Sequence, residues 1–368
     1  PAVPYSPSLY TYLRITDIND DGTLNMSDLK SVSADNASDY LLKINDIVFA
    51  RTGASTGRNY FYDGTDGDFV FAGFLIKFSL DPSKVNPRYV KYYCQSKEYR
   101  DWIAAFNTGS TRGNINTKTL ASMPIRLPDM ETQHRIVNIL DALENKRKNN
   151  KQINDNLQQQ AFALFEQLLI NAGDVECSVA DIAHLNPKRA LAKNQEAKCI
   201  EMSQLSTSGA FPSGWEKRPF TGGMRFSNGD TLLARITPCL ENGKAAFIDF
   251  LDTLEVAFGS TEYIVLASKG EVPPEFLYCL ARYPAFSDYA VKNMNGSSGR
   301  QRVSAETIGQ FKLPRPSTNE LKRFGNAVSS LFLKMRFNSL ENICLSSLRD
   351  SLLPKLISGE LDVSELDI

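Results

Sequence analysis

The amino-acid sequence predicts a mixed α/β fold in which two similar globular domains are separated by two long antiparallel coiled-coil helices. Three features predict it: an internal repeat, a long heptad-patterned segment in each copy, and a C-terminal tail that resembles the segment entering the second copy. The 368 residues are 42% hydrophobic and 23% charged, an ordinary globular composition, and this length fits two or three domains. We expect a pseudo-two-fold axis to relate the two globular domains.

The internal repeat consists of short motifs that recur in the same order. The second member of each pair follows the first by 184 to 187 residues. The matched stretches are 46–51 with 230–235, 87–90 with 274–277, 109–112 with 296–300, and 127–128 with 313–314. A nearly constant offset indicates a tandem duplication of a unit of roughly 185 residues, a period too long for a solenoid.

Each copy opens with a globular part, which we place at residues 1–130 and 173–315. Apolar runs such as 47–50 and 69–71 are separated by turns rich in glycine and aspartate. This pattern is typical of strands that alternate with short helices.

A long helix follows each globular part, at residues 131–172 and 316–358. Apolar residues recur at steps of three and four along both segments, with asparagine near the middle, where it would fix the register of a helix pair. Two separate amphipathic helices, each on its own domain, would show a similar pattern, but the matched seams favour pairing within the chain. The apolar seam residues are Ile136, Leu140, Leu143, Leu157, Leu164, Leu168, Phe324, Leu331, Leu345 and Leu352.

The C-terminal tail, residues 359–368, is predicted to complete the first domain. Residues 364–368 resemble residues 178–182, which lead into the second globular part. The first globular part has no such segment ahead of it in this sequence. We therefore expect a circular arrangement in which the tail supplies that piece in space.

Composition excludes several classes of function. The formal net charge is −1, so overall charge does not drive the chain onto DNA or a membrane, although a local basic patch remains possible. Six scattered cysteines form no CxxC pair, which argues against a zinc knuckle and is typical of a reducing, cytoplasmic compartment. Only two histidines, His134 and His184, are present to support histidine-based catalysis. No signal segment opens the sequence and no apolar run approaches the ~20 residues of a membrane span.

Residues 17–28 fit the spacing of a calcium-binding loop. Oxygen-bearing side chains stand at its first, third and fifth positions and glycine at its sixth. The twelfth position is Asp28 rather than the longer glutamate, and the matching turn at 203–209 has no carboxylate. A polar hairpin turn is therefore favoured over a metal site.

Several motifs together resemble the specificity subunit of type I restriction–modification systems, over essentially the whole chain. One departure is the start at Pro1, where members of that family usually have a segment like residues 175–187. The motifs that carry the resemblance are 109–115 (GSTRGNI), 123–128 (MPIRLP), 131–137 (ETQHRIV), 140–143 (LDAL) and 352–361 (LLPKLISGEL).

The resemblance implies a non-catalytic reader of double-stranded DNA. Each globular part would be a target-recognition domain that binds one half of a split site. The two helices would space these domains and dock two methyltransferase subunits, and restriction–translocase subunits would join the same assembly. S-adenosylmethionine, ATP and magnesium would belong to those partners, with no cofactor or metal on this chain.

The residues also argue against a self-contained enzyme. Residues 186–188 lack the aromatic of a methyltransferase catalytic loop, and the glycines at 222–223 open no dinucleotide-binding pattern. Residues 241–244 have the wrong spacing for a metal nuclease.

The candidate DNA contacts are arginines and amides in or near glycine-rich loops. Arginine can bond guanine bidentately, while hydroxyl and amide groups bind phosphates and other bases. Arg51 and Arg235 share the same sequence context in both copies, so a structural ion pair inside each domain is a comparable interpretation. The candidates are Arg51, Arg58, Asn59, Thr111, Arg112, Asn114, Arg235, Lys244, Ser298, Arg300, Gln301 and Arg302.

A function of another class stays open at this point. The same pattern would suit a coiled-coil scaffold with two protein-binding domains and no direct contact with DNA. The arginine-bearing glycine loops argue against that alternative.

Overall fold

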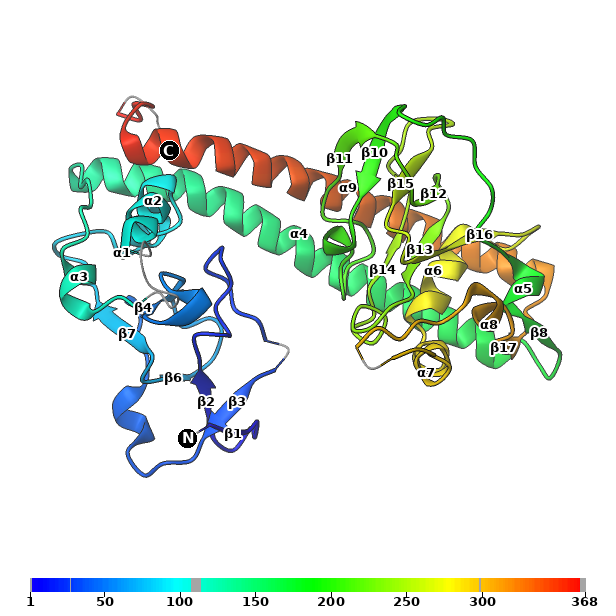
Figure 1. Ribbon diagram of the computed structural model, residues 1–368, viewed down its shortest axis with the longest axis horizontal. Helices are drawn as coiled ribbons and strands as arrows, with labels where there is room; N and C mark the ends of the chain where they lie inside the picture. The colour runs from blue at the N-terminus through cyan, green and yellow to red at the C-terminus, as the bar shows by residue number, and fades with distance from the viewer. Residues whose placement is uncertain (1, 27, 107–113, 298, 365–368) are drawn as a thin grey trace. The chain divides into compact units, whose positions relative to one another are not determined.

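The computed structural model describes residues 2–26, 28–106, 114–297 and 299–364. The chain divides into two compact units (Figure 1), residues 1–144 with 346–368 and residues 145–345. Each unit combines small sheets with short helices. The two long helices, α4 (Met130–Asn171) and α9 (Thr318–Ser358), each contribute residues to both units. The expected mixed α/β class is therefore confirmed.

The first unit contains two sheets. One has the strand order β1-β3-β2-β6, with β2 and β6 parallel, and the other is the antiparallel sheet β5-β4-β7. The strands are β1 (Ala2–Pro4), β2 (Tyr10–Leu13), β3 (Lys30–Val32), β4 (Asp46–Ala50), β5 (Asn59–Tyr62), β6 (Phe69–Phe71) and β7 (Leu75–Ser79).

Strand β4 is apolar along most of its length because it is covered on both faces. Ile47 and Phe49 point into one hydrophobic core, and Val48 and Ala50 point into another. The short helices of this unit are η1 (Ala37–Tyr40), η2 (Gly53–Ser55), α1 (Pro87–Tyr93), α2 (Lys97–Phe106) and α3 (Thr117–Ala121).

The start of α4 packs against α1 through polar contacts. Asn86 caps α1 by accepting a hydrogen bond from the backbone N–H of Arg88. The backbone N–H of Asn86 donates to Gln133 Oε1 at 2.9 Å, and its side-chain amide lies 3.0 Å from His134 Nδ1. Lys91 reaches Glu144 at 2.6 Å. The Gln-His pair that opens the helix thus holds the helix against its own domain.

The last part of the chain belongs to the first unit. Leu353, Leu356 and Ile357 of α9 share one core with Ile136 and Leu140 of α4. Beyond the helix, Val363 is buried in the same core, and its carbonyl oxygen accepts a hydrogen bond from Arg135 at 3.0 Å. The circular arrangement itself stays a prediction, because residues 365–368 lie outside the described part of the chain.

The second unit is built in the same way. Its sheets have the orders β11-β10-β15-β12, β14-β13-β16-β9 and β17-β8. The strands are β8 (Glu176–Ser178), β9 (Ala183–Leu185), β10 (Glu196–Ile200), β11 (Glu216–Pro219), β12 (Met224–Phe226), β13 (Thr231–Ala234), β14 (Ala245–Phe247), β15 (Ala257–Gly259), β16 (Tyr263–Ser268) and β17 (Lys312–Pro314). The short helices are α5 (Val179–Ile182), η3 (Met202–Gln204), α6 (Pro274–Arg282), α7 (Pro284–Lys292) and α8 (Ala305–Gly309).

The duplication is visible in the strand pairings. In both units a parallel pair, β2 with β6 or β10 with β15, lies in one sheet. In both units the second sheet has a central buried strand, β4 or β13, between two antiparallel neighbours. Three short helices follow in the same order, α1 to α3 and α6 to α8. The repeat therefore extends from short motifs to topology.

Helices α4 and α9 run antiparallel inside the second unit and meet at a layer of amides. Asn150 donates to Asn342 Oδ1 at 3.0 Å, and Asn338 donates to Asn154 Oδ1 at 2.8 Å. Asn154 in turn donates to the carbonyl oxygen of Met335 at 3.1 Å. Asn150 and Asn338 are almost fully buried. The asparagine seam predicted from the sequence thus forms the centre of the helix pair.

Seven of the ten predicted seam residues are buried or packed against a core, Leu143 and Leu345 are half-buried, and Leu164 is exposed. Leu164 is 40% exposed, whereas its neighbour Phe165 is 1% exposed. Phe165 packs against Phe276 of α6 and Phe324 of α9, with ring centroids 4.9 and 6.3 Å apart. The end of α4 therefore faces two partners, and a straight helix also drifts away from a strict heptad repeat along its length. The members of the predicted seam that are buried or packed against a core are Ile136, Leu140, Leu157, Leu168, Phe324, Leu331 and Leu352.

Replacing Asn154 by alanine should lower the free energy of unfolding by about 1–3 kcal/mol, because Asn338 loses its acceptor in a buried site. Replacing Asn154 and Asn338 together by leucine should recover part of that loss. Urea unfolding of the full chain measures both effects. Asn149→Ala, at an exposed position of the same helix, should change stability by less than about 0.5 kcal/mol. Equal effects of N149A and N154A would contradict a stabilising amide layer.

Candidate nucleic-acid interface

The glycine-rich loops meet the end of the central strand in each unit. In the first unit the backbone N–H of Ile115 donates to the carbonyl oxygen of Arg51 at 2.9 Å, next to a bridge between Thr52 and Asn114. In the second unit the N–H of Val303 donates to the carbonyl oxygen of Arg235 at 3.0 Å. The repeated connection places Asn114 in the first copy and Arg302 in the second close to the strand-end arginine.

The loop of the second unit is a hairpin closed by Asn295 and Arg302, which exchange two backbone hydrogen bonds of 2.9 Å. Gly296 has a φ of 130°, and a Cβ atom there would come within 3.1 Å of the Arg300 carbonyl oxygen, so the turn requires glycine. Arg300 is exposed at the tip. The hairpin thus presents the side chain of Arg300 to solvent.

Two other predicted contacts of the second unit are parts of an ion-pair cluster. Arg302 binds both carboxylate oxygens of Glu262, with the shortest contact 2.6 Å, and Arg235 lies 4.0 Å from the same carboxylate. The hydrogen bond from Arg302 lowers the pKa of Glu262. Of the two interpretations left open for Arg235, the structural ion pair fits this geometry better.

Lys244 and Gln301 have different environments in the second unit. The ammonium group of Lys244 donates to the carbonyl oxygen of Met202 at 2.8 Å. Gln301 is half-buried, and its backbone carbonyl accepts a hydrogen bond from Thr237. Lys244 therefore anchors a turn, whereas Gln301 is part of the hairpin that Asn295 and Arg302 close.

In the first unit, two of the predicted contacts have internal partners. Arg58 binds the carboxylate of Asp20 at 2.6 Å and the carbonyl oxygen of Ile18 at 3.2 Å. Asn59 is buried and donates to the carbonyl oxygen of Cys94 at 3.1 Å. We leave Asn59 out of the interface, because a buried amide with an internal acceptor cannot reach a base.

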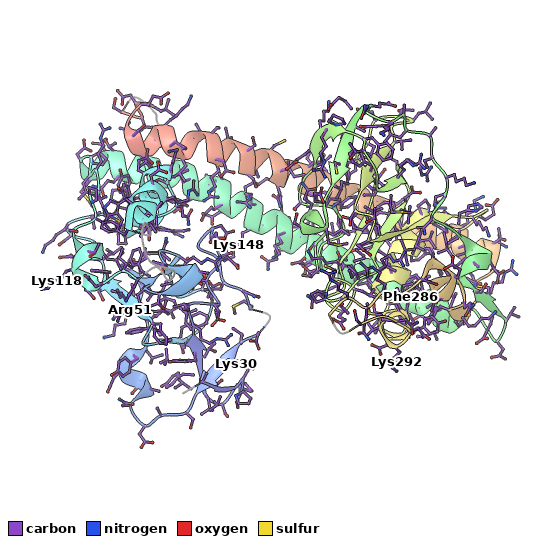
Figure 2. All side chains as sticks on the ribbon, viewed as in Figure 1. Lys30, Arg51, Lys118, Lys148, Phe286 and Lys292 are labelled. Atoms are coloured by element: carbon purple, nitrogen blue, oxygen red, sulfur yellow. The ribbon has the colours of Figure 1, made fainter. Side chains whose placement is uncertain are left out.

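Arg51, labelled in Figure 2, has a different environment. Within the described part of the chain, no carboxylate lies within 4.0 Å of its guanidinium, and its buried Nε, like that of Arg235, has no hydrogen-bond acceptor. Asn114, across the neighbouring bridge, is exposed. Thr111, Arg112 and Ser298 lie outside the described residues, so their candidacy rests on the sequence alone.

One loop-positioning residue has no signal in the sequence. The guanidinium of Arg282, at the end of α6, donates to five backbone carbonyl oxygens and to the hydroxyl of Tyr278. Those carbonyls belong to Ser206, Thr207, Gly209, Gly243 and Ala245. Arg282 thereby joins the loop after η3 to the start of β14. Its acceptors are brought together only by folding.

The polar turn at 17–28 is confirmed as a hairpin, since Ile18 and Leu24 form an antiparallel bridge. Asp17 accepts hydrogen bonds from the backbone and guanidinium of Arg14. Asp21 caps the turn at Thr23. Within the described ranges, no group of three or more histidine, cysteine or acidic side chains is arranged to hold a metal ion.

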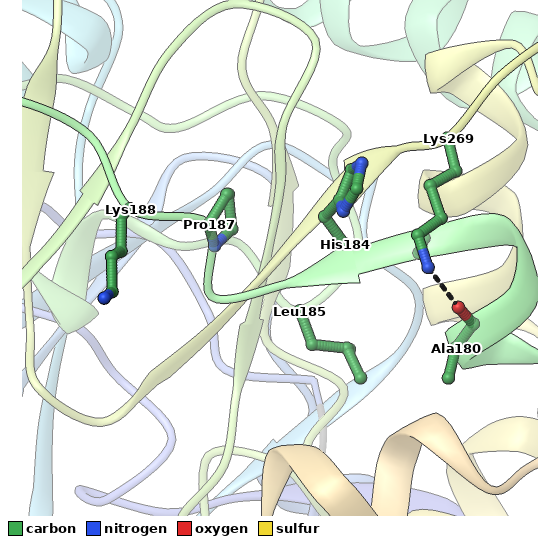
Figure 3. A pocket seen from close by; sticks show the side chains of 7 residues that line it. Ala180, His184, Leu185, Pro187, Lys188 and Lys269 are labelled. Atoms are coloured by element: carbon green, nitrogen blue, oxygen red, sulfur yellow. Dashed lines mark hydrogen bonds between the residues drawn. The ribbon is translucent and has the colours of Figure 1, made fainter.

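A shallow pocket of about 510 Å³ opens in the second unit beside β9 (Figure 3). It is lined by His184 together with Lys188 and Lys269, and Lys269 donates to the carbonyl oxygen of Ala180 at 2.6 Å. The lining residues include no carboxylate, so His184 has no acidic partner among them to form an acid–base pair. None of the described helices has both the length and the hydropathy that a bilayer-spanning segment requires.

Comparison with known proteins gives consistent similarities. A family model described as the type I restriction modification DNA specificity domain matches residues 6–159. The HindI specificity subunit of Haemophilus influenzae is 23% identical over 87% of this chain and 87% of its own length. The EcoAI specificity subunit of Escherichia coli is 30% identical over 44% of this chain and 27% of its own length. A type I S subunit from M. genitalium shares the fold, with a TM-score of 0.57 and 18% identity over 96% of this chain and 90% of that one.

The ion-pair cluster generates a pH-dependent prediction. Because the folded-state pKa of Glu262 lies below its ordinary value of 4.5, its contribution is fully present above that value and is lost as the pH falls through the folded pKa. Glu262→Gln should therefore lower the thermal unfolding midpoint of the full chain at pH 7, and the difference from wild type should shrink towards pH 3. The exposed Glu271→Gln is the control. A difference that is constant with pH would argue against the ion pair.

Proposed function

Since this chain belongs to the family of type I restriction–modification specificity subunits, we propose that it reads a bipartite DNA sequence, one half with each globular domain. The role of this subunit is recognition, and the family does not include the catalytic subunits. The target-recognition domains of the proposal are residues 1–130 and 173–315. The connecting helices are residues 131–172 and 316–358, and residues 359–368 complete the first domain.

One observation above all supports two separate DNA-reading domains. The units repeat their topology but differ in their side chains at the same rim, by which we mean the strand-end arginine, the turn opposite it and the glycine-rich loop. At this rim the second unit has Arg235 with Glu262, whereas the first unit has Arg51 with no carboxylate near it among the residues that the structure describes. A common scaffold with different side chains at one rim is what recognition of two different half-sites requires.

The proposed DNA contacts are the side chains at those rims that are free to bond a base or phosphate. In the second unit these are Arg300 and Gln301, and in the first unit Arg51 and Asn114. Thr111, Arg112 and Ser298 are proposed from the sequence. Arg58, Arg235, Lys244 and Arg302 are proposed to orient the loops rather than to read bases, because each already binds an internal partner.

The long helices offer a surface for protein partners. Phe337 of α9 is 64% exposed, and Leu333, one turn earlier on the same face, is also exposed. Exposed apolar residues four apart suit the apolar face of a partner helix. We propose that methyltransferase subunits dock on the helices and that restriction–translocase subunits join the same assembly. S-adenosylmethionine, ATP and magnesium would bind to those partner subunits.

The alternative function is a scaffold with two protein-binding domains. A mobility-shift assay of the complex reconstituted with its methyltransferase separates the two. A specific duplex should displace the labelled site at far lower concentration than a random duplex does. Equal competition by both duplexes would favour the scaffold.

Replacing Arg300 by alanine should relax recognition at one half-site only, by about 1–3 kcal/mol if a bidentate guanine contact is lost. Sequencing of the sites methylated by the reconstituted complex measures the change. Lys148→Ala, which removes an exposed charge from α4, should leave both half-sites unaltered. Equal damage to both half-sites, or none, would exclude Arg300 as a base contact.

The helix pair should set the spacing between the half-sites. Inserting one heptad after Glu144 in α4 and another after Leu345 in α9 keeps the amide layer and both apolar cores in register. Each helix then lengthens by about 10 Å, close to three base pairs. The spacer in the methylated sites should grow by about three base pairs while the half-site sequences stay the same. An unaltered spacer would show that other parts of the complex set the distance.

A further inference from the structure

The two units have different side chains in the turn that lies opposite the strand-end arginine. In the second unit the backbone N–H of Arg235 donates to the carbonyl oxygen of Glu262, in the turn between β15 and β16. In the first unit the N–H of Arg51 donates to the carbonyl oxygen of Phe74, in the turn between β6 and β7. Both hydrogen bonds measure 3.0 Å. Phe74 therefore occupies in the first unit the place that Glu262 occupies in the second.

The strand registers confirm the equivalence. Ala50 pairs with Leu75, and Ala234 pairs with Tyr263, so each arginine directly follows the last paired residue of its strand. Residues directly opposite each other on antiparallel strands project from the same face, with Cβ atoms about 5 Å apart. Arg51 and Phe74 thus share one face of the turn.

The substitution changes the electrostatics of the rim. Arg302 forms hydrogen bonds with the carboxylate of Glu262, and Arg235 lies 4.0 Å from the same carboxylate, so this cluster of two guanidinium groups and one carboxylate has a net charge of one. The bridge that holds Arg302 to Ile236 corresponds in the first unit to the bridge between Asn114 and Thr52. Among the described residues of the first unit, which exclude 107–113, Arg51 stands in this place with the amide of Asn114 across the bridge and with no carboxylate within 4.0 Å.

Phe74 has no packing role that explains it. It is 62% exposed, although the next residue, Leu75, is buried. The adjacent Gly73 is exposed as well. The exposed ring of Phe74 offers an apolar surface. The guanidinium of Arg51, which has no acidic partner among the described residues, offers two parallel hydrogen-bond donors. Those are the two chemistries that distinguish a thymine methyl group and a guanine edge in the major groove.

We propose that Arg51 and Phe74 are specificity-determining residues for the first half-site. The guanidinium of Arg51 donates to the O6 and N7 atoms of a guanine, and the ring of Phe74 packs on the C5 methyl group of a nearby thymine. This inference rests on the proposed function of the chain. In the second unit Glu262 occupies the corresponding place, and the exposed hairpin with Arg300 carries the readout there.

The test uses the complex reconstituted with its methyltransferase and duplexes in which each thymine in turn is replaced by uracil, which removes only the methyl group. For wild type, one replacement in the first half-site should weaken binding about four-fold, the value expected for one buried methyl group. For Phe74→Ala that replacement should have no effect. Replacements in the second half-site should affect both proteins equally.

Two further variants separate the parts of the proposal. Arg51→Lys keeps the charge but loses bidentate geometry, so it should relax the preference for guanine at one position of the first half-site while the salt dependence of binding stays nearly the same. Phe74→Glu should place a carboxylate beside Arg51, as in the second unit, and abolish both preferences. Tyr5→Ala, at another exposed aromatic residue of the first unit, should leave both half-sites unaltered.

The outcomes are distinct. The inference is overturned if F74A responds to uracil as wild type does, if the first half-site contains no thymine, or if F74A impairs assembly with the methyltransferase and leaves DNA binding intact. A complex that binds every duplex equally, with wild-type subunit, would instead refute the proposed function itself.

Discussion

The register of α4 against α9 is the constraint on which the rest of this chain depends. In the second unit the register is set by buried amides, since Asn150 bonds with Asn342 and Asn154 with Asn338. Sliding one helix past the other by a turn would leave these groups without partners in a site that excludes water, at a cost of about 1–3 kcal/mol each. Apolar seams alone tolerate such slips far better, because one leucine contact replaces another.

Both long helices also supply the cores of the globular domains. Phe165 of α4 packs against Phe276, and Ile136 and Leu140 share a core with Leu356 of α9. A residue on these helices can therefore pack against two surfaces, the partner helix and the domain beside it. For this reason the buried face departs from an ideal heptad at Leu164. Val363, beyond the end of α9, is buried in the core of the first unit.

Duplication has conserved the scaffold of the two units and altered the rim that would read DNA. The hydrogen bond between the strand-end arginine and the opposite turn is kept in both copies, but the turn presents Glu262 in one and Phe74 in the other. A backbone hydrogen bond does not depend on the identity of the side chain. The turn residue, Phe74 or Glu262, can therefore differ between the units without loss of the turn. Arg282, which binds five carbonyl oxygens, holds the second unit's loops in the same manner, through backbone groups that do not depend on sequence.

The sequence by itself determined the duplication, the mixed α/β class, the two long helices and their central asparagines, because these depend on repeated motifs and on the spacing of apolar residues along one segment. It also pointed to the glycine-rich loops and to Arg51 and Arg235. Only the tertiary structure decided which arginines are free. Arg302 meets Glu262 forty residues away, Arg58 meets Asp20 across a turn, and Phe74 faces Arg51 through a strand register. Ion pairs and burial depend on which distant segments pair, and no local pattern in the chain encodes that choice.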